Sequence, residues 1–282
     1  MYWQSRLDDS ESLSAQALSL GKKLLGNNNA QVARSYLLQA RAKMAQGKMA
    51  EASSDYKTGE TILTKIKAPG DPMLGDGLNC LAQFYCQSGQ LTKSRDFFEQ
   101  ALRTYETAFG KESPHAAECL DGLARIATLE KDYDRAESLY KQALSMSAKT
   151  RGESHVAVGR SLANLGWMYL QKKNYAEATD CLEQSIAIFE QNALGDSLDL
   201  SMADLYLGQS LVAKGNVAAA EPLFKRALNI AQRVEPHGKL ALESFNQLVK
   251  IYRLQNRKQD IVDLLKTVQT PARGGPGHGG ES

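Results

Sequence analysis

Two stretches of the chain have nearly the same sequence. Residues 11–26 read ESLSAQALSLGKKLLG, and residues 137–152 read ESLYKQALSMSAKTRG. Their starting positions differ by 137 − 11 = 126 residues, which is three times 42. An amphipathic helix can form with many sequences and does not require this one. The recurrence therefore indicates an internal repeat with a period of 42 residues.

Stepping along the chain by 42 residues brings small and apolar residues into register. One column is small throughout: Ala52, Ser94, Ala136, Ala178 and Ala220. Four positions later, the residues are large: Tyr56, Phe98, Tyr140, Leu182 and Phe224. Twelve positions before the first column, they are small again: Ala40, Ala82, Ala124, Gly166 and Gly208. Several columns in one register indicate a genuine repeat rather than a coincidence of composition.

Each repeat predicts a pair of antiparallel helices. Apolar residues recur at steps of three and four, which is the helical period. A polar break, such as SGQ at 88–90, divides each unit, and glycine there suits the left-handed residue that ends a helix. Asp71-Pro72 and Ser113-Pro114 each offer a capping side chain before a proline at the first helical position.

We expect five full repeats over residues 30–236. The first helices are expected near 30–46, 73–88, 113–130, 155–172 and 198–214. The second helices are expected near 49–66, 91–109, 133–150, 175–192 and 217–233. Residues 1–29 are interpreted as a half-repeat, a second helix that caps 30–46. A degenerate sixth repeat is expected at 237–269, and the Gly-rich tail 270–282 is expected to be disordered.

Composition bounds the class of protein. The chain has 282 residues, of which 43% are hydrophobic, enough to bury a substantial core. Its 34 basic and 32 acidic residues give no electrostatic signal for nucleic acid or for an anionic membrane. No apolar run reaches the roughly 18–20 residues that a membrane helix needs. With Met1 as the natural start, we expect a cytoplasmic protein; for a trimmed chain this expectation lapses.

The four cysteines, Cys80, Cys86, Cys119 and Cys181, have no paired spacing of the metal or redox kind. We interpret them as buried thiols rather than as a disulfide framework.

These helix pairs resemble a known family. Small residues at Ala82 and Ser94, aromatics at Tyr85 and Phe98, and a turn before Leu91 resemble the tetratricopeptide repeat. The 42-residue unit and the turns FGKESPHAAECLDGLA (109–124) and RGESHVAVGRSLANLG (151–166) resemble the kinesin light chain type. That type shows a glycine, then His-Pro, whereas this chain has Ser-Pro and His-Val, and no coiled coil precedes the repeats.

The resemblance implies an all-α fold, a right-handed α-solenoid of stacked helix pairs whose first helices line a concave groove. The recurring small and apolar residues also indicate that the helix pairs stack on one another, because a single pair cannot bury its own apolar face. Candidate peptide-binding residues on the first helices are Asn79, Gln83, Arg125, Arg160, Asn164, Trp167, Tyr206 and Gln209. The motor cargo role is not carried over.

These residue types suit a peptide ligand. A side-chain amide can hold a peptide backbone through a donor and an acceptor together. A guanidinium can bind a carboxylate, and aromatic rings can anchor a partner. In an alternative interpretation, Trp167 belongs partly to the core, and Asp121 neutralises Arg125 one turn away.

Some family members hold a terminal carboxylate with a clamp of Lys, Asn, Asn, Lys and Arg. The matching positions here are Asn79, Gln83, Gly122, Arg160 and Asn164 in one register. The next register gives Asp121, Arg125, Asn164, Met202 and Tyr206. Neither reproduces the clamp, so we predict no binding of chaperone tails.

Signals for catalysis are weak. The chain has neither a phosphate-binding Gly-x-x-x-x-Gly-Lys-Ser/Thr loop nor a His-Glu-x-x-His motif. His115, His155, His237 and His278 fall in different repeats or in the tail, which favours capping or solvated roles over metal ligation. We therefore predict no catalytic residue, no metal and no cofactor.

The leading hypothesis is a noncatalytic protein–protein interaction scaffold that binds a peptide or helix of a partner in the groove. Nucleic acid and membrane are not expected partners. A second hypothesis makes the chain the regulatory or sensor arm of a larger multidomain protein, and a third makes it an enzyme in its own right. Weak self-association through the ends of the solenoid is a further expectation, because an imperfectly capped end exposes an apolar face.

Overall fold

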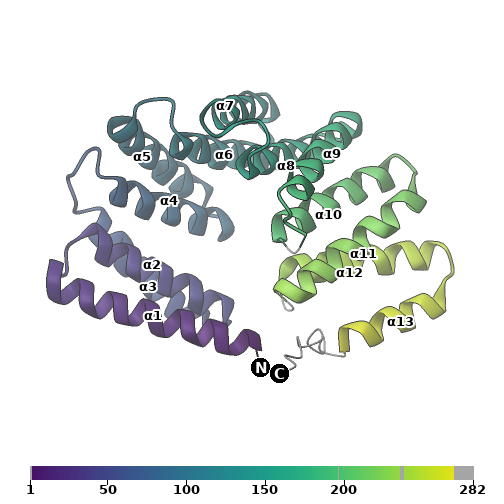
Figure 1. Ribbon diagram of the computed structural model, residues 1–282, viewed down its shortest axis with the longest axis horizontal. Coiled ribbons are helices and arrows are strands. Elements are labelled where there is room, and N and C mark those ends of the chain that lie inside the picture. Colours follow the sequence, from purple (N-terminus) through teal and green to yellow (C-terminus); the bar gives the residue numbers. More distant parts are fainter. Residues whose placement is uncertain (1, 196, 236–237, 270–282) are drawn as a thin grey trace, which may run out of the picture. The chain divides into compact units, whose positions relative to one another are not determined.

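The computed structural model describes residues 2–195, 197–235 and 238–269, and within these ranges it contains thirteen α-helices and no strand (Figure 1). The chain divides into two compact units, Met1–Arg151 and Gly152–Ser282. The helices of the first unit are α1 (Tyr2–Leu25), α2 (Ala30–Ala45), α3 (Met49–Leu63), α4 (Pro72–Gln87), α5 (Leu91–Phe109), α6 (Pro114–Leu129) and α7 (Tyr133–Arg151). Those of the second unit are α8 (Val156–Gln171), α9 (Tyr175–Gln191), α10 (Leu198–Ala213), α11 (Val217–Val234), α12 (Lys239–Leu254) and α13 (Lys258–Gln269).

Consecutive helices form the pairs that the sequence predicts. In the first unit, α2 packs on α3, α4 on α5 and α6 on α7, and α1 packs on α2. In the second unit, α8 packs on α9, α10 on α11 and α12 on α13. In both units the first helices also contact one another, as α4 contacts α6 and α8 contacts α10. The predicted all-α fold of stacked helix pairs is confirmed.

The predicted helix ranges agree with the observed bounds to within a few residues. The largest difference is at the beginning, where α1 starts at Tyr2 and extends well before the quoted stretch 11–26. The division into a half-repeat, five full repeats and a degenerate sixth stays a prediction. The tail 270–282 lies outside the described residues.

The capping side chains predicted at the starts of α4 and α6 form the expected hydrogen bonds. The Asp71 carboxylate accepts a hydrogen bond from the Met73 backbone N–H at 2.9 Å, and Ser113 Oγ accepts one from Ala116 at 3.2 Å. Pro72 and Pro114 occupy the first helical positions, where a missing N–H leaves no bond unmade. These caps fix where the first helices α4 and α6 begin.

In the turn between the two helices of a repeat, one residue has a positive φ, the left-handed backbone conformation, whether or not that residue is glycine. Gly89 has φ 75°, as expected for the residue after a helix. In the third and fourth repeats, Lys131 (φ 65°) and Lys173 (φ 62°) adopt the same conformation. A residue with a side chain destabilises the protein by roughly 1–2 kcal/mol when it adopts the left-handed conformation. Packing of the flanking helices therefore imposes this conformation on Lys131 and Lys173.

Close contact between paired helices depends on small residues. A Cβ added to Gly208 of α10 would lie 2.5 Å from Cε1 of Phe224, a fully buried residue of α11. Phe98 of α5 instead fills the space beside Gly122, on the first helix of the following repeat. Ser94 replaces the usual alanine, and its buried hydroxyl donates to the Ala82 carbonyl at 2.7 Å. This bond joins α4 to α5 at the small-residue columns.

A charged cluster holds the last helix pair to α11. The Glu221 carboxylate accepts hydrogen bonds from Arg257 Nη1 at 2.5 Å and from the Tyr252 hydroxyl at 3.2 Å. Lys225, one turn along α11, also pairs with Glu221 at 2.8 Å. The hydrogen bond from Arg257, opposed by burial, lowers the pKa of Glu221 to about 2.

This cluster predicts a pH dependence of stability. Because the pKa of Glu221 is lower in the folded than in the unfolded protein, the folded state binds fewer protons between the usual value of 4.5 and about 2. Its contribution is therefore complete above pH 4.5 and is lost as the pH falls to about 2. Urea unfolding across this window is expected to show a smaller loss of stability in Glu221→Gln than in the wild type. Equal slopes for the two proteins would contradict the prediction.

Within the described residues, no helix combines the length and the apolar character that crossing a bilayer requires.

Candidate functional site

The eight predicted groove residues all lie on first helices, and they divide between the two units. The first-unit face consists of Asn79 and Gln83 on α4 and Arg125 on α6. The second-unit face consists of Arg160, Asn164 and Trp167 on α8 and of Tyr206 and Gln209 on α10. A joint role of the two faces in one groove stays a prediction.

The second-unit face contains an aromatic pair. The rings of Trp167 and Tyr206 are tilted by 32° with their centroids 6.4 Å apart, and both side chains are half-buried. This geometry belongs to the favourable range for aromatic pairs. Asn164 lies on α8 one turn before Trp167 and is also half-buried. The two predicted aromatic anchors are therefore adjacent, beside an amide.

Polar residues extend the same face in both directions. Arg160 Nε donates to Asp199 Oδ2 of α10 at 2.7 Å, and more than half of the Arg160 side chain is exposed. Gln209 Nε2 donates to Glu243 Oε1 of α12 at 3.3 Å. An exposed ion pair contributes only about 0–1 kcal/mol, so a ligand carboxylate can compete with Asp199 for the guanidinium at small cost.

The first-unit face contains a buried acceptor atom. Asn79 is half-buried, and its Oδ1 atom is buried with no hydrogen-bond partner, whereas Gln83 and Arg125 are exposed. Leaving a buried acceptor unpaired costs about 1–3 kcal/mol. Because this atom is enclosed by the protein, the groups that the first-unit face offers to a ligand are the exposed side chains of Gln83 and Arg125.

Beside Asn79, a network ties three helices of the first unit together. Asp76, one turn before Asn79, accepts a hydrogen bond from the Tyr105 hydroxyl at 2.8 Å and pairs with Arg34 Nη1 at 3.6 Å. Burial and the hydrogen bond to Asp76 raise the pKa of Tyr105, so the phenol stays protonated and keeps donating. This network fixes the side of α4 on which Asn79 lies.

Sequence reasoning missed the acidic partners on these faces. Asp199 and Glu243 contact Arg160 and Gln209, and Asp76 contacts Arg34. Columns that were compared only for size and apolar character do not reveal such contacts, because Arg160 and Gln209 meet partners at other positions of the next repeat, whereas Arg34 and Asp76 share one column of polar residues. A search for opposite charges about 39–42 residues apart on first helices would have found Asp199 and Asp76.

The alternative interpretation of Trp167 is partly correct, since its ring is half-buried rather than fully exposed.

The histidines have structural roles where they are described. His155 Nδ1 accepts the Ala157 N–H at 3.1 Å, which makes it the cap of α8. His115 stacks on Tyr105, with ring centroids 4.8 Å apart. His237 and His278 lie outside the described residues. Across the described part of the chain, no group of three or more His, Cys, Asp or Glu is placed to hold a metal ion.

The cysteines are less uniformly buried than predicted. Cys119 is fully buried, and the other three are half-buried. Burial raises the pKa of Cys80, Cys86 and Cys119, which keeps these thiols protonated at neutral pH.

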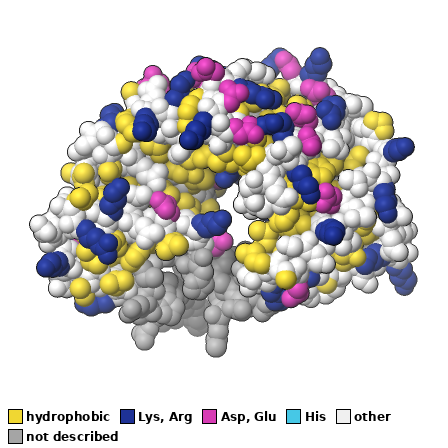
Figure 2. Space-filling view, turned by 180° about the vertical axis from the view of Figure 1, so that it is seen from behind, with side chains coloured by type: hydrophobic (Ala, Val, Ile, Leu, Met, Phe, Trp, Pro, Cys, Tyr) yellow, Lys and Arg dark blue, Asp and Glu magenta, His cyan; other side chains and the backbone are white. Residues whose placement is uncertain are grey.

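Side chains of both charges lie on the face drawn in Figure 2. On the face drawn in Figure 2, Lys and Arg side chains lie among Asp and Glu side chains rather than in a field of one sign. This agrees with the nearly equal numbers of basic and acidic residues in the sequence.

Comparison with known proteins defines the class. The family model described as tetratricopeptide repeat matches residues 75–149, 126–191 and 199–269, well over half of the chain. The chain belongs to this family. Protein KINESIN LIGHT CHAIN-RELATED 3 of Arabidopsis thaliana is 25% identical over 219 residues, 76% of this chain and 33% of that protein. The protein is thus a tetratricopeptide repeat protein of the kinesin light chain type, as predicted, and it spans about a third of the length of this curated relative.

Two solved structures have the same fold. The crystal structure of BtubC (BKLC) from P. vanneervenii matches with a TM-score of 0.62 and 23% identity, over 82% of this chain and 93% of that chain. That of a Rap protein complexed with Competence and Sporulation Factor matches with a TM-score of 0.64 and 15% identity, over 92% of this chain and 78% of that chain. At these identities the likeness concerns the fold alone.

Proposed function

We propose that the chain is a noncatalytic protein–protein interaction scaffold that binds a peptide or helix of a partner along its first helices. The observation that supports this most directly is the Trp167–Tyr206 pair, with Asn164 one turn away. Half-buried aromatics beside an amide are the groups that anchor protein partners. The Rap protein complexed with Competence and Sporulation Factor shows that a chain of this fold can bind another molecule.

The exposed side chains of the first-unit face give the proposal a second set of contacts. A peptide laid along α4 could exchange hydrogen bonds with the Gln83 amide, and its carboxylates could bind the Arg125 guanidinium of α6. The setting that we propose is cytoplasmic, where thiols such as Cys80 remain reduced. The role as a regulatory or sensor arm of a larger protein stays an alternative.

The test uses peptides selected by the full chain from a random display library. Trp167→Ala is expected to weaken binding of the selected peptides by about 30-fold or more, because loss of an anchor costs at least about 2 kcal/mol. The matched control is Phe109→Ala, which removes an exposed aromatic from the second helix α5 and should leave affinity unchanged. Isothermal titration calorimetry and circular dichroism measure affinity and helix content.

Two outcomes would contradict the proposal. One is selection of no peptide by the wild-type chain. The other is retention of wild-type affinity in Trp167→Ala combined with Asn164→Ala and Arg160→Ala, with helix content intact.

A further inference from the structure

Helix α12 places an acidic residue at the edge of the second-unit face. Glu243 is exposed, and its Oε1 atom accepts hydrogen bonds from Gln209 Nε2 of α10 at 3.3 Å and from Gln247 Nε2 at 2.8 Å. Gln209 follows Tyr206 by one helical turn, and the Tyr206 ring pairs with that of Trp167. The Glu243 carboxylate is therefore joined through the Gln209 amide to the helix that bears the Tyr206 ring.

The other acidic residues on the first helices of the second unit are neutralised. Within the described residues, α8 carries no acidic residue, α10 carries Asp199 and Asp204, and α12 carries Glu243. Arg160 pairs with Asp199 at 2.7 Å, and Arg226 pairs with Asp204 at 2.5 Å. Glu243 forms no ion pair within the same part of the chain, and its two amide partners are uncharged. The described residues therefore leave the negative charge of Glu243 uncompensated.

The basic residues nearest to Glu243 along α12 do not supply the missing charge. Lys239 lies one turn before Glu243 and Lys250 lies two turns after it, and neither forms an ion pair with it in the described part of the chain. A lysine side chain is flexible, so a ligand that pairs with it must also order it. The Glu243 carboxylate is already held by two amides, and a ligand does not bear that cost. Glu243 is therefore a preorganised anionic group on the helix next to the aromatic pair.

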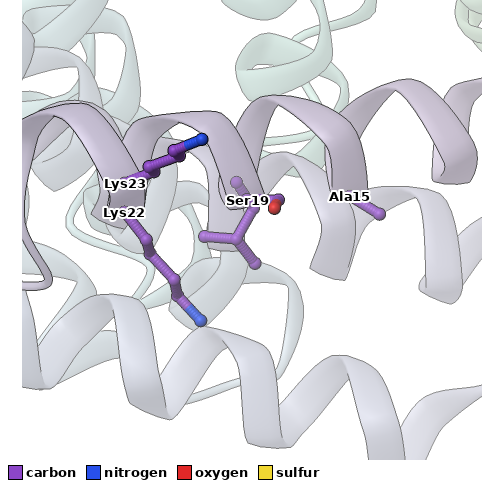
Figure 3. A pocket seen from close by; sticks show the side chains of 5 residues that line it. Ala15, Ser19, Lys22 and Lys23 are labelled. Atoms are coloured by element: carbon purple, nitrogen blue, oxygen red, sulfur yellow. The ribbon is translucent and has the colours of Figure 1, made fainter.

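Two surface pockets carry the opposite charge and do not suit a basic ligand. Figure 3 shows one of them beside α1, where the charged lining residues are Lys22 and Lys23. The charged residues that line the other pocket, beside α11, are Lys225, Arg226 and Arg233. A cationic side chain of a ligand would meet like charges in both. The second-unit face offers the complementary chemistry, because aromatic rings and a carboxylate both attract a cation.

We propose that the partner peptide carries a lysine or arginine that forms an ion pair with Glu243, beside its anchor on the aromatic pair. The inference rests on the proposed function, because it names the chemistry of the ligand for the same face. Packed helices such as α10 and α12 lie about 8–10 Å apart, which an extended peptide spans in about three residues. The basic residue is therefore expected about three positions from the residue that contacts Trp167 and Tyr206.

The test uses peptides that the full chain selects from a random display library. These peptides are expected to share a lysine or arginine about three positions from a large apolar residue, always on the same side of it. Glu243→Lys is expected to weaken their binding about tenfold, because repulsion replaces an attraction of similar size. Exchanging the shared basic residue for glutamate should weaken binding to the wild type by a similar factor and restore binding to the Glu243→Lys variant. Surface plasmon resonance at low and high salt measures these affinities.

The matched control is Glu183→Lys, which makes the same change of charge at an exposed position of the second helix α9 and should leave affinity unchanged. Circular dichroism checks that both variants keep their helix content. Peptides that need Trp167 but share no basic residue overturn the inference and leave the proposed function standing. So do peptides that need Trp167 and bind the Glu243→Lys variant as tightly as the wild type. Selection of no peptide at all overturns both.

Discussion

Replacing Arg226 with methionine is expected to lower the free energy of unfolding by about 3–5 kcal/mol, the usual cost of leaving a buried charge without its partner. The Asp204 side chain on α10 is 0% exposed, and Arg226 of α11 donates to both of its oxygens, from Nε at 2.6 Å and from Nη2 at 2.5 Å. Arg226 also pairs with Glu190 of α9 at 2.6 Å. Urea unfolding of the wild type and the variant measures the loss.

Two controls separate this effect from loss of an ordinary surface pair. Arg160→Met breaks the exposed pair with Asp199 and is expected to cost no more than about 1 kcal/mol. In the double variant Asp204→Leu/Arg226→Met the buried charge is gone as well, so most of the lost stability should return. If Arg226→Met unfolds no more readily than Arg160→Met, the buried pair is not important to stability.

The Arg226→Met variant should also respond to pH in a defined direction. Burial raises the pKa of Asp204, and Arg226 opposes that rise. Without the guanidinium the pKa of Asp204 rises further, so the folded variant binds a proton that the unfolded chain has released. The stability deficit of the variant is therefore expected to shrink as the pH falls and to grow as the pH rises through the raised pKa. Urea unfolding at acidic and neutral pH measures this change.

Phe224→Ala is expected to destabilise the protein by about 3–5 kcal/mol, as for other buried aromatics. Phe224 is fully buried, and its ring fills the space that Gly208 leaves beside α10. The truncated side chain leaves a cavity that the glycine cannot fill. Thermal or urea unfolding measures the change.

The control for Phe224→Ala is Phe109→Ala, which removes a half-exposed ring from α5 and should cost much less. Gly208→Ala completes the comparison, because its new Cβ would overlap the Phe224 ring. That overlap should outweigh the roughly 1 kcal/mol that alanine gains over glycine within a helix. A stabilised Gly208→Ala protein would contradict this account of the packing.

Most of the fold could be predicted because the columns carry packing information directly. Gly208 is small and Phe224 is large because the two residues touch in space. Ala82 and Ser94 are both small because α4 and α5 come close together at these positions. Asp71 and Ser113 mark helix starts through local chemistry that no tertiary contact overrides. The left-handed lysines Lys131 and Lys173 could not be predicted from local preference, since packing imposes their conformation.

The candidate site could be predicted less completely. The helical period places Asn164, Trp167 and Tyr206 on first helices, and the structure brings the two rings together, while their role as anchors stays a prediction. The partners of Arg160 and Arg226 depend on which positions of neighbouring repeats meet, and a single repeat pattern does not fix this. The buried pair of Asp204 with Arg226 joins the two helices of one repeat, and it could not be predicted because the two residues belong to different columns.

Because each of the described helices contacts only helices close to it in sequence, insertions and deletions should be tolerated according to their length. Adding or removing a whole 42-residue segment leaves every remaining helix beside a neighbour of the kind it had before. One extra residue inside α11, by contrast, would turn everything after it by about 100° around the helix axis. Such an insertion between Ala220 and Phe224 would move the Phe224 ring away from Gly208 and expose it to water. Homologous proteins from different organisms are therefore expected to differ in length by whole repeats of 42 residues.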